Sequence, residues 1–200
     1  ALAPDGVDGV VGSPDIIEDL LILCAMIRKR TGCGPLDDKL LIGSMNRGGL
    51  AGCSFELDDA MTAYDLEGIR RLKLDGAKLM VRFNEKDALC GATMKYCSDA
   101  VNELNIANVP IFLETLFVDE NKRIIKTAEA VIKSISAASA MGNSCRNTWL
   151  KVPYCEGFGK VAASTTLPLL ILGGAPEGTH ESYLKELQSR YAAANSALEI

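Results

Sequence analysis

Thr148-Trp149-Leu150-Lys151-Val152-Pro153-Tyr154 is a short apolar run that contains one lysine and is stopped by a proline. The run has the length of a buried strand, and Pro153 lacks the backbone donor that a strand would need to continue. Longer segments with helical spacing lie on both sides of it. Lys151 is therefore predicted to lie near the carboxyl end of a strand, within a repeating strand–helix architecture.

The rest of the chain alternates in the same way between short apolar runs and longer helical patterns. Strands are predicted at residues 7–12, 39–45, 76–83, 110–116, 147–152 and 167–172. Helices are predicted at residues 16–30, 65–74, 87–105, 120–141, 157–163 and 179–193. Strict alternation of this kind predicts an α/β fold with a parallel sheet.

Two closures of such a sheet compete, an open doubly wound sheet and a (β/α)8 barrel. No GxGxxG follows the first predicted strand and no Walker A motif occurs, which disfavours a nucleotide-binding open sheet. Candidate functional residues follow or end several strands: Asn46, Arg47, Arg82, Glu114, Lys151, Gly173 and Gly174. Because a barrel collects its active groups from many strand ends, a fold of the TIM-barrel type is predicted, as one domain over residues 1–200.

Composition narrows the class of protein. The 200 residues carry a formal net charge of −5 and are 48% hydrophobic, which suits one domain with a sizeable core and gives no footprint for nucleic acid. No apolar run reaches the roughly 18 residues of a membrane span. The seven cysteines are odd in number and irregularly spaced, as in a reduced, cytoplasmic protein. A single histidine disfavours a histidine-rich metal site, and no cofactor is expected.

Lys151 is the sharpest catalytic candidate. An amine in an apolar strand loses its proton more readily, and a second cation, Lys78 or Arg82, strengthens this effect. Glu114 interrupts the apolar run 111–113, where a carboxylate needs a partner, and the lysine of the next strand is the obvious one. The pair is either a nucleophile with its proton-transfer group or a structural ion pair, and spacing alone leaves both open.

Two further features accompany this pair. Gly173 and Gly174 follow the last predicted strand, where barrels often bind phosphate, although glycines also serve ordinary turns. Tyr154 and Tyr64 are candidate proton donors or simple packing residues. Tyr154 is also counted among the candidate substrate-binding residues.

At these residues the sequence resembles a known family. The stretch 149–154 and the stretch 167–174 look like the lysine strand and the following Gly-Gly strand of the DeoC/LacD class I aldolase superfamily. Phe112-Leu113-Glu114 is similar to the glutamate strand of tagatose-bisphosphate aldolases. The loop 46–52, the stretches 55–59 and 62–65, and the strand 74–82 resemble a narrower branch, aldolase-like proteins associated with myo-inositol catabolism in actinobacteria.

The resemblance implies a (β/α)8 barrel in which Lys151 matches the Schiff-base lysine, Glu114 the supporting acid/base, and Gly173 with Gly174 part of the phosphate site. Since the family lysine lies on the sixth strand, the six predicted strands correspond to the second to seventh. The first strand and the eighth, with its Gly-Arg phosphate loop, have no counterpart here. Two sheet edges would be left open, so the chain is expected to be either a fragment of a longer protein or a variant that closes differently or by association. A homo-oligomer is expected.

The resulting functional hypothesis is a class I aldolase-like lyase that cleaves a carbon–carbon bond in a sugar or polyol-derived phosphate. The residues expected to bind this small phosphorylated substrate are Asn46, Arg47, Lys78, Arg82, Tyr154, Gly173 and Gly174. Two alternatives remain open. One is a truncated, non-catalytic barrel that retains binding or assembly, and the other is a phosphate-binding barrel isomerase with Glu114 as its base.

Overall fold

A computed structural model of the chain describes residues 6–47, 58–173 and 180–198. The strands are β1 (Gly9–Gly12), β2 (Leu40–Ser44), β3 (Gly76–Phe83), β4 (Ile111–Phe117), β5 (Thr148–Pro153) and β6 (Leu169–Leu172). The helices are α1 (Pro14–Thr31), α2 (Leu66–Arg71), α3 (Cys90–Ile106), α4 (Ala128–Ser139), α5 (Phe158–Ala162) and α6 (His180–Leu198). Gly174 and the loop residues 48–57, which include part of the loop singled out from the sequence, lie outside the described residues.

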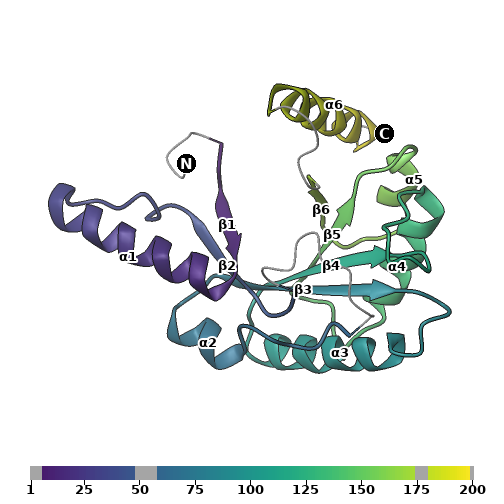
Figure 1. The fold of residues 1–200 in the computed structure, drawn as a ribbon, viewed down its shortest axis with the longest axis horizontal. Coiled ribbons are helices and arrows are strands. Elements are labelled where there is room, and N and C mark those ends of the chain that lie inside the picture. Colours follow the sequence, from purple (N-terminus) through teal and green to yellow (C-terminus); the bar gives the residue numbers. More distant parts are fainter. Residues whose placement is uncertain (1–5, 48–57, 174–179, 199–200) are drawn as a thin grey trace.

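The six strands form one sheet in chain order, β1-β2-β3-β4-β5-β6, and every pair of neighbours is parallel. The sheet curls, with helices along its convex side, so the described chain has the form of a half-barrel (Figure 1). The predicted parallel α/β architecture with six βα units is confirmed. The form agrees with a partial (β/α)8 barrel.

Local signals in the sequence explain where the helices begin and end. Pro14 occupies the first turn of α1, and Gly32 closes it in the left-handed conformation with its N–H bonded to the Arg28 carbonyl, as expected of a helix C-cap. The side chains of Asp65 and Thr127 accept backbone N–H groups at the starts of α2 and α4. These caps satisfy donors that the first turn of a helix leaves open.

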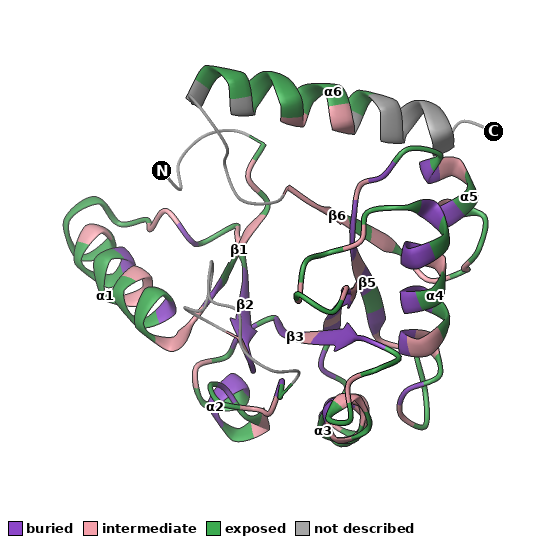
Figure 2. Cartoon of the chain, turned by 45° about the vertical axis from the view of Figure 1, so that its right-hand side comes forward, coloured by how far each residue is buried: buried purple, intermediate pink, exposed green. Residues whose placement is uncertain are grey.

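The main core lies between the sheet and its helices. Alternate residues of β3, β4 and β5, such as Leu79, Leu113 and Leu150, are almost fully buried against the apolar faces of α3 and α4. Figure 2 shows this buried layer running through the central strands and the sheet-facing sides of the helices. Because side chains alternate across a strand, the other residues of β3, β4 and β5 point to the concave face.

The concave face carries the polar candidates in register. Met80, Glu114, Lys151 and Leu170 form one row across β3 to β6. The row toward the amino ends of the strands contains Lys78, Phe112 and Trp149, and the row toward the carboxyl ends contains Arg82, Leu116, Pro153 and Leu172. Charged groups are therefore held within a largely apolar surface.

The largest difference from a predicted boundary is at the start of α4. The helix expected at 120–141 begins at Ala128, because residues 117–125 form a tight hairpin closed by the bridge between Val118 and Ile124. The Asp119 carboxylate accepts the backbone N–H groups of residues 121 and 123, which fixes the turn. Asn84 donates to the Asp119 carbonyl at 2.9 Å, so the hairpin is tied to the loop after β3.

None of the helices in the described part of the chain is long and apolar enough to cross a membrane.

Candidate active site

Lys151, Glu114 and Lys78 form one ionic cluster on the concave face. Lys151 Nζ lies 3.0 Å from Glu114 Oε2, and Lys78 Nζ lies 2.9 Å from the same oxygen. The first contact follows from register, because Lys151 and Glu114 are paired on adjacent strands. The second is diagonal, because Lys78 lies one row lower and its long side chain reaches across to β4. The predicted meeting of lysine and glutamate is thus present, with a second lysine beside it.

The three groups differ in their access to solvent. The side chains of Lys78 and Glu114 are 7% and 8% exposed, whereas that of Lys151 is 23% exposed. Lys151 is therefore the member of the cluster that an incoming molecule reaches most easily. Lys78 lies behind it as a nearly buried ammonium.

Burial and charge act in opposite directions on the cluster. Burial lowers the pKa of Lys78, and the charge of Lys151 lowers it further, although Glu114 partly offsets both effects. Burial by itself would raise the pKa of Glu114, but Lys78 and Lys151 outweigh it and hold that pKa below its ordinary value. Glu114 is thus a carboxylate at neutral pH, and Lys78 gives up its proton more readily than a surface lysine does.

Both ammonium groups contact the same oxygen of Glu114. Glu114 Oε2 is thus the point at which the two lysines converge. A carboxylate fixed in this way can accept a proton from a substrate hydroxyl and return it. This arrangement combines an accessible amine, a fixed base and a second cation.

A second ionic cluster lies at the carboxyl end of β3. Arg82 Nε is 3.1 Å from each carboxylate oxygen of Asp59, and Arg82 Nη2 is 2.8 Å from Oδ1. Arg47 Nε lies 3.4 Å from the same Oδ1, and its backbone is in the left-handed region, with φ of 55°. Asp59 is completely buried. It was not predicted from the sequence, where nothing separates it from its exposed neighbour Asp58.

Asn46 has its carboxamide committed to the protein itself. Its Oδ1 accepts the backbone N–H of Met80 at 2.7 Å, and its Nδ2 donates to the carbonyls of Met80 and Asp59 at 2.8 Å each. The side chain extends the β2–β3 ladder by one residue and is fully buried. In this structure Asn46 therefore positions Asp59 and β3, and its predicted role in substrate binding stays a prediction.

The remaining candidates lie at the edge of the site or away from it. Tyr154 stacks on Phe158 of α5 with ring centroids 5.8 Å apart. The carbonyl of Gly173 accepts a hydrogen bond of 3.0 Å from Arg190 of α6. Tyr64 is buried beside Gly43 in the layer between sheet and helices, on the opposite side of the sheet from Lys151, so a role as proton donor to that lysine is excluded.

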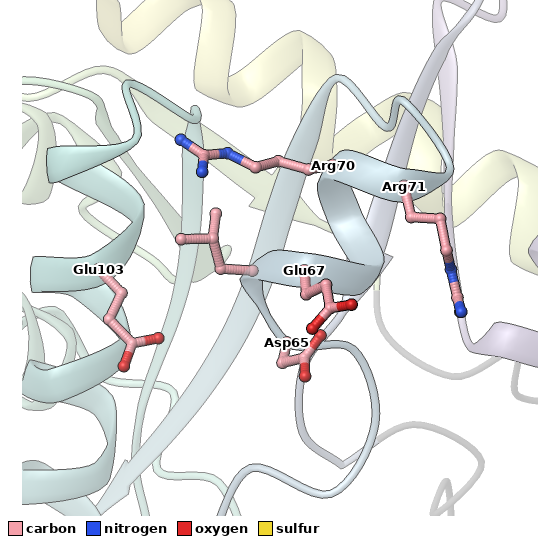
Figure 3. Close-up of a pocket in the computed structure, with 6 residues that line it drawn as sticks. Asp65, Glu67, Arg70, Arg71 and Glu103 are labelled. Carbon is pink, nitrogen blue, oxygen red and sulfur yellow. The ribbon is translucent and has the colours of Figure 1, made fainter.

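Pockets and metal-ligand groups elsewhere add no competing site. A pocket of about 610 Å³ lies between α2 and α3, lined by Leu66 and by charged residues of both helices (Figure 3). It contains none of the side chains of the two ionic clusters. Among the described residues, no group of three or more His, Cys, Asp and Glu side chains is placed to hold a metal ion.

Solved structures with the same fold include aldolases. An archaeal fructose-1,6-bisphosphate aldolase, with its catalytic lysine covalently bound to the carbinolamine intermediate of the substrate, is 19% identical with a TM-score of 0.67, over 94% of this chain and 68% of that one. A Schiff-base-forming fructose-1,6-bisphosphate aldolase is 16% identical with a TM-score of 0.61, over 88% and 72%. At these identities the comparison shows the fold, that of class I aldolase barrels.

A nearer relative is Cgl0159 from Corynebacterium glutamicum. Its crystal structure is 39% identical in sequence with a TM-score of 0.78, and the match covers 96% of this chain and 62% of that one. The chain thus spans less than two thirds of the length of this relative. The comparison with curated proteins found no match. The family described as Cgl0159-like matches residues 1–197, and the chain belongs to that family.

Proposed function

We propose that this chain carries the catalytic centre of a class I aldolase, which cleaves a carbon–carbon bond through a Schiff base on Lys151. The observation that carries the proposal is the Lys151–Glu114–Lys78 cluster, with both ammonium groups within 3.0 Å of one buried carboxylate oxygen. A structural ion pair needs one cation for one carboxylate. A second, nearly buried lysine is costly and is better explained by a need to move protons.

The reaction follows from the roles of these groups. The neutral amine of Lys151 attacks the ketone carbonyl of the substrate, and the resulting carbinolamine loses water to give an iminium. Glu114 then removes the proton from the substrate hydroxyl two carbons away. The carbon–carbon bond breaks, an aldehyde leaves, and the bonding electrons pass into the iminium to form an enamine. Protonation of the enamine and addition of water release the second product and restore the amine.

Lys78 contributes charge and a proton to this cycle. Once Lys151 has become an iminium, Lys78 still contacts Glu114 Oε2, so the carboxylate stays in place. Its lowered pKa makes Lys78 a suitable proton donor to the hydroxyl that leaves as water. Lys78 is thereby assigned a role in proton transfer, beyond the substrate binding expected from the sequence.

The proposed substrate is a sugar or polyol-derived phosphate. The solved structures of similar fold are fructose-1,6-bisphosphate aldolases, and the sequence resembles the branch associated with myo-inositol catabolism. Gly173 and Gly174 are proposed to contact the phosphate, with Arg47, Arg82 and Tyr154 at the mouth of the site. A cytoplasmic location and a homo-oligomeric state are part of the same proposal.

The test is borohydride trapping. Incubation with dihydroxyacetone phosphate and sodium borohydride should add one substrate to the protein, with the loss of one water and the gain of two hydrogens, and peptide mapping should place the adduct on Lys151. Lys151→Met should abolish the addition. Lys160, exposed at the end of α5, provides the matched control, because Lys160→Met should leave trapping unchanged.

Two outcomes would argue against this reaction. A folded protein whose Lys151 stays unmodified at saturating substrate excludes the Schiff base. Isomerase activity that survives borohydride would instead indicate proton abstraction by Glu114 without a covalent intermediate.

A further inference from the structure

A pocket of about 360 Å³ lies on the convex side of the sheet, where β3 and β4 end between α3 and α4 (Figure 1). Phe83 and Phe117, the last residues of the two strands and partners in register, both line it. Cys90 at the start of α3 and Ala137 on α4 line it as well, so its lining is largely apolar. None of the described residues that line it belongs to the two ionic clusters, so this cavity is separate from the candidate active site.

Lys133 and Glu85 supply the charged groups of this pocket. Lys133 Nζ lies 3.1 Å from Glu85 Oε1 and 5.7 Å from the ring centroid of Phe117, so the ammonium is held over an aromatic face. The two charged side chains are 62% and 70% exposed, and a pair this exposed contributes little to stability. Since an ammonium also has three donors, Lys133 can take up a second anion without a large loss.

The lining indicates the chemistry of a ligand. A concave site of this volume, with aromatic walls and a few polar groups, is typical of small-molecule binding, and two phenylalanine rings favour an aromatic body. The group placed over the aromatic ring is the ammonium of Lys133, so the head group of the ligand should be an anion, and one cation matches a monoanion such as a carboxylate. Asn84, the remaining polar residue described in the lining, donates to the hairpin before α4 and accepts from its own loop.

We propose that this pocket binds a small aromatic carboxylate, whose ring packs against Phe83 and Phe117 and whose carboxylate pairs with Lys133. The sulfur of Cys90 in the same lining provides a polarisable contact for the ring. The proposal goes beyond the aldolase function and does not depend on it, because the pocket shares no side chain with the cluster around Lys151.

The test is an NMR titration of the backbone amides with 3-phenylpropionate and, separately, with 3-phenylpropan-1-ol, which has the same ring and chain but no charge. Both should give saturable shifts around Phe83 and Phe117, and the acid should bind about fivefold more tightly. In Lys133→Met the acid should lose this advantage while the alcohol binds as before. Lys95→Met, which removes an equally exposed lysine from α3, should preserve the advantage. Ala137→Leu, which fills the pocket, should weaken both ligands.

Three results overturn the proposal: no saturable shifts around the pocket with 3-phenylpropionate, a Lys133→Met protein that still prefers the acid, or a folded Ala137→Leu protein that binds both ligands as the wild type does. Thermal melts of each variant establish folding. If Ala137→Leu does not fold, the comparison of Lys133→Met with Lys95→Met decides alone, since equal preferences in the two variants contradict a role for Lys133. The titration needs no sugar phosphate, so its outcome is separate from that of borohydride trapping.

Discussion

At the scale of single residues, Glu114 is the residue on which the stability of the lysine–glutamate cluster depends most. Replacing it with glutamine leaves the nearly buried ammonium of Lys78 and the partly exposed one of Lys151 without a counter-charge, and breaking a buried pair in this way costs about 3 to 5 kcal/mol. Glu114→Gln should therefore lower the free energy of unfolding in urea by that amount. The exposed pair of Lys95 and Asp99 on α3 gives the control, because Asp99→Asn should have a far smaller effect. If Glu114→Gln and Asp99→Asn lower the free energy of unfolding equally, the burial of the cluster around Glu114 is contradicted.

The same carboxylate predicts how stability depends on pH. The pKa of Glu114 is lowered from its ordinary value of 4.5, so between the lowered value and 4.5 the unfolded chain binds more protons than the folded one. Its contribution is present above 4.5 and is lost as the pH falls through the folded pKa. The difference in unfolding free energy between the wild type and Glu114→Gln should therefore shrink in acid. A difference that stays constant from pH 7 to pH 3 would show that Glu114 does not titrate in this way.

Residue identities were predicted unevenly from the sequence. The meeting of Lys151 and Glu114 follows from an interrupted apolar strand and from the rule that consecutive parallel strands pair, and both facts can be read from the chain. Asp59 could not be identified, because its burial depends on where the segment before α2 crosses β3. The hydrogen bonds by which the Asn46 carboxamide extends the β2–β3 ladder leave no signal in the sequence either, because they depend on how the two strands are placed.

At the scale of elements, close contact between β2 and its covering layer depends on Gly43. A Cβ atom there would lie 2.6 Å from Tyr64, 2.7 Å from Ile69 and 2.8 Å from Leu74. Gly43→Ala should therefore destabilise the protein by about 1 to 3 kcal/mol through overpacking, as measured by urea unfolding. Gly91 in α3 has open space around its Cβ position, so Gly91→Ala should be neutral or stabilising by up to about 1 kcal/mol. If Gly43→Ala leaves the free energy of unfolding unchanged, the side chains around residue 43 have room to shift and make space for a Cβ atom.

Element types were predictable, whereas some boundaries were not. β3 was predicted at its observed limits, because a stretch that is apolar apart from Lys78 and Arg82 begins at a glycine and is followed by an asparagine. The start of α4 was placed eight residues early. Residues 120–127 carry no strong helix breaker, and the true start is set by the Thr127 cap and by the hairpin that the Asp119 carboxylate stabilises.

At the scale of the whole molecule, α1 presents an apolar surface. Ile22, Leu23 and Met26 are each more than half exposed, and Leu23 and Met26 share one side of the helix. The self-association expected from the sequence should therefore involve α1. Leu23→Glu with Met26→Lys should lower the sedimentation coefficient at high protein concentration without lowering the melting temperature. The control is Ile106→Lys, at an exposed position at the end of α3, which should change neither the sedimentation coefficient nor the melting temperature. If the α1 variant associates like the wild type, the exposed face of α1 is not the interface.

The order of strands in the sheet has a consequence for how the chain reaches its native state. Each strand pairs with the strand that comes next along the chain, and no later segment is inserted between two earlier ones. Every pairing therefore closes a loop of a single βα unit, and the entropic cost of loop closure grows only slowly with length. Such a topology lets the sheet grow one unit at a time, so that each segment leaving the ribosome finds its partner already in place.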